Sequence, residues 1–156
     1  MAISILAVLV LLCALTLTVP CEAKIPVLSL EKLVRQADVI CIAETERKEL
    51  LPDDQGRVTV VRNHLKLTSC LKGTAATAVV VTKKRRREDN LTVPAKGPML
   101  LFLKRGNDDL YYPVNSIQGV WPLDKGSPQG MGLGITVQQV IDEIYRQHSE
   151  TAGGIQ

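Results

Sequence analysis

The hydrophobic and polar positions divide this chain into one uninterrupted apolar stretch at its beginning and a series of short, patterned runs after it. Residues 2–19 carry no charge and consist mainly of Leu, Val, Ala and Ile. Pro20 ends the stretch, and Cys21 and Ala23 supply small residues where a signal peptidase would cleave. The pattern predicts a signal peptide at residues 1–23 and a secreted or periplasmic mature protein. An uncleaved membrane anchor is the alternative, because a transmembrane helix needs ~20 apolar residues and no Lys or Arg precedes this stretch.

Two later segments have the apolar spacing of amphipathic helices. In residues 29–38, apolar side chains recur every three or four positions after Ser29, which can cap a helix. Near the other end of the chain, Thr136 and Gln139 have the spacing of a capping box. The apolar stripe that follows comprises Val137, Val140, Ile141 and Ile144. We therefore expect one helix before the strands and one after them, with a flexible tail at residues 149–156.

Between these helices, short apolar runs separated by turn residues predict five or six strands. They are residues 39–43, 58–71, 78–82, 99–103, 110–114 and, more weakly, 119–123. The continuous apolar character of 39–43 and 99–103 is typical of central, fully buried strands. Residues 44–55 are charged and end in a turn, and the glycine- and proline-rich stretch 124–134 predicts a loop.

Two strands carry signals of irregular geometry. Apolar residues fall on even positions at Val58 and Val60 and on odd positions from Val61 onward, which predicts a β-bulge that bends the strand. Pro113 cannot donate a backbone hydrogen bond, so it predicts that residues 110–114 form an edge strand. Together the elements favour a mainly β domain at residues 29–148, an antiparallel OB-like barrel of five to six strands with flanking helices. Residues 24–28 are predicted to be a linker.

Five short motifs carry a resemblance to known domains. They lie at residues 37–40 (ADVI), 71–73 (LKG), 101–103 (LFL), 111–113 (YYP) and 119–121 (GVW). In these motifs the chain resembles a secreted OB-like barrel domain of uncharacterised bacterial proteins. It is more distantly similar to the tissue-inhibitor-of-metalloproteinases and netrin-like domains. Those inhibitors bind a catalytic zinc through an N-terminal cysteine, whereas cleavage after Ala23 leaves Lys24 here, so the resemblance implies the barrel alone.

Charge and composition limit the class of partner. The formal net charge of the whole chain is +3, and removal of the leader, which contains Glu22 and no base, raises it by one. Aromatic residues amount to only 3% of the chain, which disfavours a base-stacking surface, so no nucleic-acid partner is expected. A membrane partner is expected only if the leader is retained.

The clearest surface feature is a run of five cations, Lys83, Lys84, Arg85, Arg86 and Arg87. Its positive potential favours an anionic partner, either a protein or a glycan surface. The alternative is a solvated hairpin loop whose charge prevents strand edges from pairing with other chains. Three residues after Arg87, Asn90 begins an Asn-Leu-Thr glycosylation motif, which matters only in a eukaryotic secretory pathway.

Cys41 and Cys70 remain after the leader is removed, and they permit either one disulfide or two buried thiols. The histidines, His64 and His148, have no paired ligand spacing, so neither a metal nor another cofactor is expected. The sequence contains no nucleophile elbow and no dinucleotide fingerprint.

The leading hypothesis is a secreted, non-enzymatic binding module whose basic run contacts an anionic partner. A protease-inhibitor-like module is the second hypothesis, and it rests on the resemblance of the barrel alone. The third is an extracytoplasmic enzyme with its site at the mouth of the barrel. Its candidate residues would be Asp108, Tyr111 and Tyr112.

Overall fold

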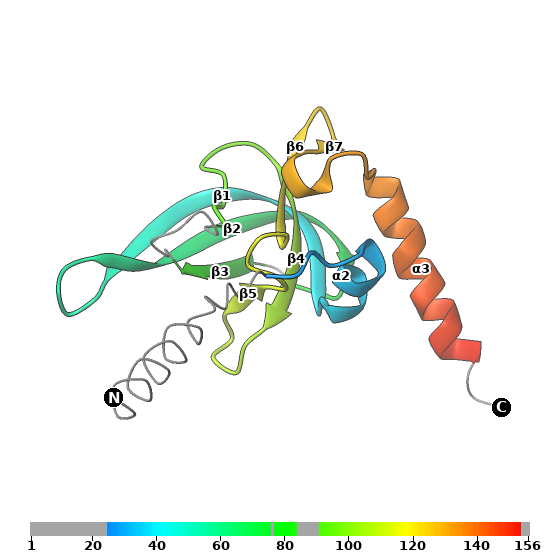
Figure 1. Cartoon of the computed structure of the whole chain (residues 1–156), viewed down its shortest axis with the longest axis horizontal. Helices are drawn as coiled ribbons and strands as arrows, with labels where there is room; N and C mark the ends of the chain where they lie inside the picture. Colours follow the sequence, from blue (N-terminus) through cyan, green and yellow to red (C-terminus); the bar gives the residue numbers. More distant parts are fainter. Residues whose placement is uncertain (1–24, 76, 84–90, 154–156) are drawn as a thin grey trace, which may run out of the picture.

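A closed five-stranded β-barrel forms the body of the protein, with two further strands and two helices outside it (Figure 1). The computed structural model describes residues 25–75, 77–83 and 91–153. The barrel strands are β1 (Val39–Pro52), β2 (Val58–Lys72), β3 (Thr77–Lys83), β4 (Met99–Arg105) and β5 (Tyr111–Pro113). The remaining elements are α2 (Leu30–Gln36), β6 (Val120–Asp124), β7 (Ser127–Pro128), the 3-10 helix η1 (Gly130–Gly132) and α3 (Val137–Gly153).

The barrel closes where β1 pairs with β4. The strand order is β1-β2-β3-β5-β4, and antiparallel pairing of residues 39–43 with residues 99–103 joins the last strand to the first. The predicted all-antiparallel arrangement is wrong at one position, because β3 and β5 are parallel and pair through Val80 and Tyr111. Strand direction depends on the path of the connections, which residue periodicity does not encode. The mainly β class and the helix at each end are confirmed.

Strands β1 and β4 are buried on both faces, as their continuous apolar runs predict. Val39, Cys41, Ala43, Leu101 and Leu103 belong to the barrel interior. The intervening residues of the same strands face a second core beneath the two helices. This second core contains Leu33, Val34, Ile40, Leu100, Phe102, Trp121, Val140 and Ile144. One pair of strands therefore separates two hydrophobic cores and contributes to both.

The hairpin of β1 and β2 is longer than the sequence predicts. Residues 44–52, expected to be a charged connection, continue β1, and the hairpin extends away from α2 and α3 (Figure 1). The turn follows at Asp53, whose Oδ1 accepts the backbone N–H groups of Gln55 and Arg57, both at 2.9 Å. These charged residues form a solvent-facing strand because they pair with β2. They lack the apolar alternation by which a sequence indicates such a strand.

The expected irregularity in β2 is present, one residue from where the periodicity places it. The register shifts between Leu51 and Pro52, whose partners are Val60 and Val58. Three further shifts occur along the same pair of strands. Each shift adds a residue to one strand and bends the pair, which allows long strands to curve around a small barrel.

Strand β5 is not an edge strand, contrary to the prediction from Pro113. It lies between β3 and β4 in the barrel. Its antiparallel partners on β4 are residues 103–105, and Leu103 pairs with Pro113. The missing N–H of Pro113 is tolerated because the pairing with β3 is confined to Val80 and Tyr111, at the start of β5.

The helices begin where the sequence predicts. Ser29 Oγ accepts the backbone N–H of Lys32 at 3.3 Å. Thr136 and Gln139 form a reciprocal capping box, with bonds of 2.7 and 3.1 Å. Helix α3 continues through residues 149–153, which the sequence assigned to a tail, because Arg146 forms an ion pair with Glu150 one turn later. The expected loop 124–134 also contains β7 and η1.

The segment expected to be a linker is fixed to the domain by two buried amides. Gln118 accepts the backbone N–H of Leu28 at 2.6 Å and donates to the carbonyl of the same residue at 2.9 Å. Asn115 donates to the carbonyl of Pro26 at 2.9 Å. The two amide side chains thus form hydrogen bonds with the backbone of this segment, as a neighbouring strand would. The described part of the segment is therefore part of the domain.

Gly73, which directly follows β2, provides a test of the close approach between this turn and the backbone of Asp38, which follows α2. Its φ of +70° is left-handed, and a Cβ would lie 2.5 Å from the carbonyl oxygen of Asp38. Gly97 has a φ of +84° with nothing within 4 Å of the same position. We expect Gly97→Ala to lower the unfolding free energy by about 1 kcal/mol through backbone strain alone, and Gly73→Ala by about 3 kcal/mol. Urea denaturation of both variants measures the difference. Equal losses would contradict the close approach to Asp38.

Candidate functional site

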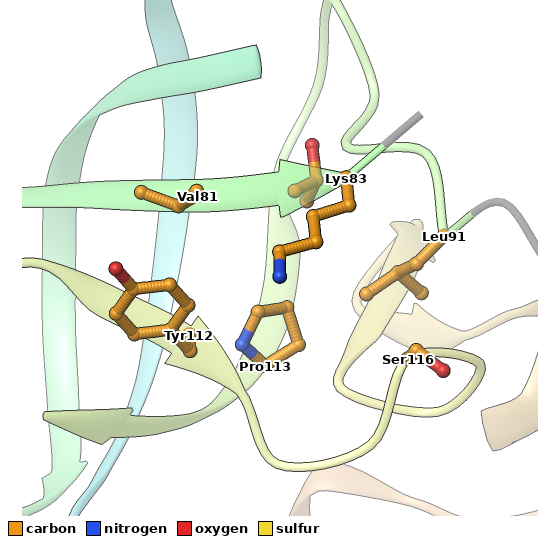
Figure 2. Close-up of a pocket in the computed structure, with 7 residues that line it drawn as sticks. Val81, Lys83, Leu91, Tyr112, Pro113 and Ser116 are labelled. Carbon is orange, nitrogen blue, oxygen red and sulfur yellow. The ribbon is translucent and has the colours of Figure 1, made fainter. Parts of the chain in front are cut away.

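Two shallow hollows meet at the C-terminal end of β3. The first, here called the Tyr112 hollow, has a volume of about 150 Å³ (Figure 2). It is lined by Val81, Thr82, Lys83, Leu91, Tyr112, Pro113 and Ser116. The second, called the Leu50 hollow, has a volume of about 240 Å³. It is lined by Lys48, Leu50, Val58, Val61, Asn63, Thr82, Lys83, Leu91, Thr92 and Val93.

The Tyr112 hollow lies where β3 and β5 stop pairing. In the described part of the chain the register between these strands is the single pair Val80 and Tyr111. Beyond that pair, Pro113 follows on β5, and its ring cannot donate a hydrogen bond to a strand. The ends of β3 and β5 are therefore not joined, and side chains from Leu91 and Ser116 complete the lining between them.

The Leu50 hollow lies between the β1–β2 hairpin and the chain that returns from β3 toward β4. Lys48 Nζ donates to the carbonyl of Val93 at 2.6 Å, and Thr45 Oγ1 donates to the carbonyl of Pro94 at 2.7 Å. These two bonds hold residues 93 and 94 against β1. Leu50 is 59% exposed at this site, so its side chain is available to a ligand.

The charged groups in the two linings are cationic. Lys48 and Lys83 line the hollows, and the described lining residues include no carboxylate, histidine or thiol. Figure 2 shows the side chain of Lys83 extending from β3 toward Pro113. Apolar walls with ammonium groups at the rim favour an anionic ligand that also carries an apolar group.

Tyr112 joins the hollow to a carboxylate outside it. Its phenol donates to Asp108 Oδ2 at 2.9 Å. This hydrogen bond lowers the pKa of Asp108 below its ordinary value and raises the pKa of Tyr112. The third residue of the enzyme hypothesis, Tyr111, is only 8% exposed and belongs to the barrel interior. The structure therefore brings Asp108 and Tyr112 together and separates Tyr111 from them.

The predicted basic run is described at its first residue only. Lys83 is exposed and lines both hollows. Lys84, Arg85, Arg86 and Arg87, together with Asn90, lie outside the described residues. Leu91, which follows them in the sequence, also lines both hollows. The described residues on either side of residues 84–90 are thus both part of the candidate site.

The predicted histidines and cysteines lie away from the hollows. His64 contacts Arg47 at 3.3 Å and Glu49 at 3.4 Å on the exposed hairpin, and His148 is exposed on α3. Cys41 and Cys70 face each other across β1 and β2. Among the described residues, no group of three or more His, Cys, Asp or Glu side chains could hold a metal ion.

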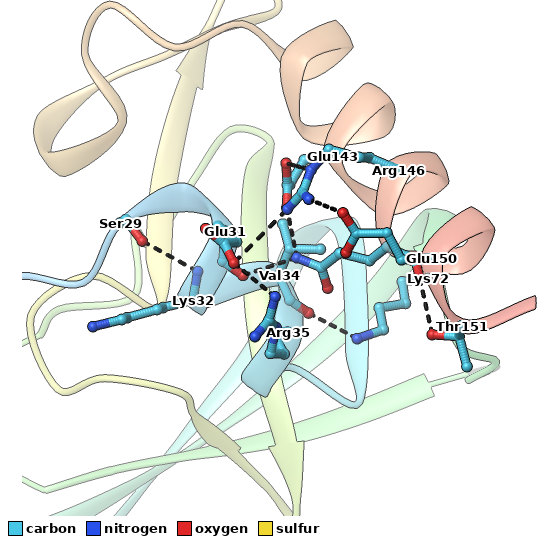
Figure 3. A network of polar contacts seen from close by, with 11 residues as sticks. Ser29, Glu31, Lys32, Val34, Arg35, Lys72, Glu143, Arg146, Glu150 and Thr151 are labelled. Carbon is cyan, nitrogen blue, oxygen red and sulfur yellow. Dashed lines mark hydrogen bonds and ion pairs between the residues drawn. The ribbon is translucent and has the colours of Figure 1, made fainter. Parts of the chain in front are cut away.

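A second group of charged side chains joins the two helices and has a structural role (Figure 3). Arg146 of α3 contacts Glu143 at 2.6 Å and Glu31 of α2 at 3.9 Å. Gln147 donates to the carbonyl of Glu31 at 2.9 Å. Lys72 donates to the carbonyls of Val34 and Ala37 at 2.7 and 2.6 Å, and burial lowers its pKa. These contacts are made within the group and with backbone carbonyls of α2 and of its C-cap residue, Ala37.

The sequence predicted one of the two lining cations, Lys83, and missed Lys48 and the apolar walls. Leu50 and Leu91 stand next to charged stretches, where periodicity predicts no strand. The available signal was Leu50-Leu51 within a charged run, which would have indicated an exposed apolar pair. Tyr112 was named for the enzyme hypothesis only.

Comparison with known proteins adds no family to this description. No protein-family model matches the chain, and a search of curated proteins found no matching relative. Among the described residues, no helix has the length and apolar character needed to cross a membrane.

Tyr112 and Asp108 provide a test of the geometry beside the hollow. In Tyr112→Phe the phenol donor is lost, so we expect the pKa of Asp108 to rise toward its ordinary value. Because the folded pKa of Asp108 is lowered, its contribution to stability exists above its unfolded pKa and is lost as pH falls through the folded value. NMR titration of the Asp108 carboxyl measures the shift. Tyr145→Phe, at a 69% exposed tyrosine on α3, is the control and should leave Asp108 unchanged. An unaltered Asp108 pKa in Tyr112→Phe would contradict the contact.

Proposed function

We propose that this protein is an exported, non-enzymatic binding module that recognises an acidic segment of a partner protein. The observation that carries the proposal is the meeting of two apolar hollows at Lys83, the first residue of the basic run. A barrel compatible with an OB-like architecture supports it, since such barrels commonly bind ligands on their strands and loops. The signal peptide that the sequence predicts at residues 1–23 is the reason for proposing export.

The apolar walls favour a protein partner over a polysaccharide. A sulfated or uronic-acid polysaccharide is recognised through its charges and needs cations alone. The side chains of Leu50, Val81 and Leu91 would instead bury apolar groups of a ligand, a gain of about 25 cal/mol for each Å² removed from water. A peptide that alternates apolar and acidic residues would place the first in the hollows and the second beside the cations.

The cationic side chains of the linings favour a negatively charged ligand and make its affinity depend on the salt concentration. Attraction between exposed charges is screened over about 10 Å at 0.1 M ionic strength, so affinity should fall as salt is added. The apolar contacts are not screened in this way. Binding that depends on both the charge attraction and the apolar contacts should therefore weaken as salt is added but not disappear.

Neutralising the basic run tests the electrostatic part of the proposal. We expect replacement of Lys83, Lys84, Arg85, Arg86 and Arg87 by glutamine to weaken binding of a peptide of alternating Glu and Leu at least tenfold at low salt. Isothermal titration with the chain that begins at Lys24 measures this affinity. The matched control replaces five exposed lysines elsewhere, namely Lys32, Lys66, Lys96, Lys104 and Lys125.

The control separates a local site from a general charge effect, because both variants lose the same charge. Equal weakening in the two variants would contradict a site at β3. Heparin is titrated in parallel. Binding of heparin alone, with no affinity for the peptide, would replace the protein partner by an anionic glycan.

Leu50 tests the apolar part. Leu50→Ser should weaken binding of the Glu–Leu peptide roughly tenfold, because a leucine that is 59% exposed in the free protein would lose its burial in the complex. The control is Leu133→Ser, at a 73% exposed leucine beyond η1. Titration with a Glu–Ala peptide completes the comparison. If Leu50→Ser binds like the parent protein, the Leu50 hollow has no part in recognition.

A further inference from the structure

Cys41 and Cys70 stand directly opposite each other in the register of β1 and β2. Opposed residues of an antiparallel pair have their side chains on the same face, with Cα atoms about 4.5–5.5 Å apart. A disulfide needs a Cα separation of roughly 4.4–6.8 Å, so the backbone places the two residues within bonding range. The sequence allowed either a disulfide or two thiols, and the register supplies the missing geometric condition.

The two thiols already contact each other. Burial raises the pKa of Cys41 to about 12, and interaction with the Cys70 thiol adds to this shift. Cys70 also donates to the carbonyl of Ala75 at 3.6 Å. The strand register and this interaction agree in placing the two thiols side by side.

The pair is accessible from one side only. Cys41 is fully buried in the barrel interior, whereas Cys70 is exposed. An open hollow lies over Cys70, and Gly73, Thr74 and Ala75 complete its lining. An oxidant can therefore reach Cys70 first, and Cys41 can react only with what Cys70 carries.

We propose that Cys41 and Cys70 form an intrachain disulfide by thiol–disulfide exchange that begins at Cys70, with a small-molecule disulfide such as oxidised glutathione as the oxidant. The Cys70 thiol loses its proton to solvent, and its sulfur attacks one sulfur of oxidised glutathione and releases one glutathione thiolate. The Cys41 thiol then loses its proton, and its sulfur displaces the second glutathione from Cys70. Two protein thiols are oxidised while one glutathione disulfide is reduced to two thiols.

The burial of Cys41 makes the second step the slower one. A thiol attacks as the thiolate, and burial, the largest cause of the raised pKa of Cys41, persists in the mixed disulfide and leaves little thiolate near neutral pH. The mixed disulfide at Cys70 should therefore accumulate before it resolves. This order of events distinguishes the pair from two thiols that are oxidised independently.

The disulfide is independent of the proposed binding site. Val60 of β2 pairs with Lys83, and Cys70 lies ten residues further along the same strand, up to roughly 33 Å away. Loss of the disulfide should leave peptide binding unchanged. Failure of one proposal therefore leaves the other standing.

Oxidation of the reduced chain that begins at Lys24 tests the proposal. With oxidised glutathione, mass spectrometry should show a transient single glutathionyl adduct on Cys70 and then a product lighter than the reduced chain by two hydrogen atoms. Peptide mapping should join the segments that contain Cys41 and Cys70. The disulfide should raise the melting temperature by roughly 10 °C relative to the reduced chain.

Two single variants act as controls. Cys41→Ala should stop at the Cys70 adduct, because the resolving thiol is missing. Cys70→Ser, a change at an exposed position, should leave Cys41 unmodified while the protein stays folded. An adduct at Cys70 that never resolves in the parent chain, or a covalent dimer through Cys70, would overturn the proposal.

Discussion

The pairing of β1 with β4 is the interaction on which the rest of the structure depends. Residues 39–43 and 99–103 close the barrel, and alternate side chains of both strands fill the barrel interior and the core beneath the helices. Each of these strands is therefore buried on both faces. Since a shift of one residue would exchange the two sets of side chains, the register of this pair is fixed from both sides.

The site arises at the part of the barrel that this pairing does not reach. β3 and β5 meet at Val80 and Tyr111 and then separate, and the outer half of β1 continues beyond its pairing with β4. At these ends Leu50 is exposed, and Leu91 packs only partly against the barrel interior. The helices cover the opposite part of the barrel, and their charged side chains bind one another (Figures 1 and 3).

The candidate binding site and the elements that stabilise the fold thus occupy different parts of one small domain. The helical layer and the β1–β4 pair hold the fold, while the ends of β1, β2 and β3 present cationic and apolar groups to solvent. The two cysteines lie at the other end of β2, where a covalent link would brace the barrel without touching the hollows. This separation allows the surface of the site to vary at little cost to the core.

By itself the sequence determined the elements whose signal is local: the capped helices, the buried runs of β1 and β4, the bulge in β2 and the run of cations that begins at Lys83. Propensity, capping and side-chain periodicity act within a few residues, so a single chain displays them. Only the tertiary structure decided that β3 and β5 are parallel, that residues 44–52 extend β1, and that β5 lies inside the barrel despite Pro113. It also placed Leu50, Leu91 and Lys83 around common hollows, because such proximity depends on how distant strands close on one another.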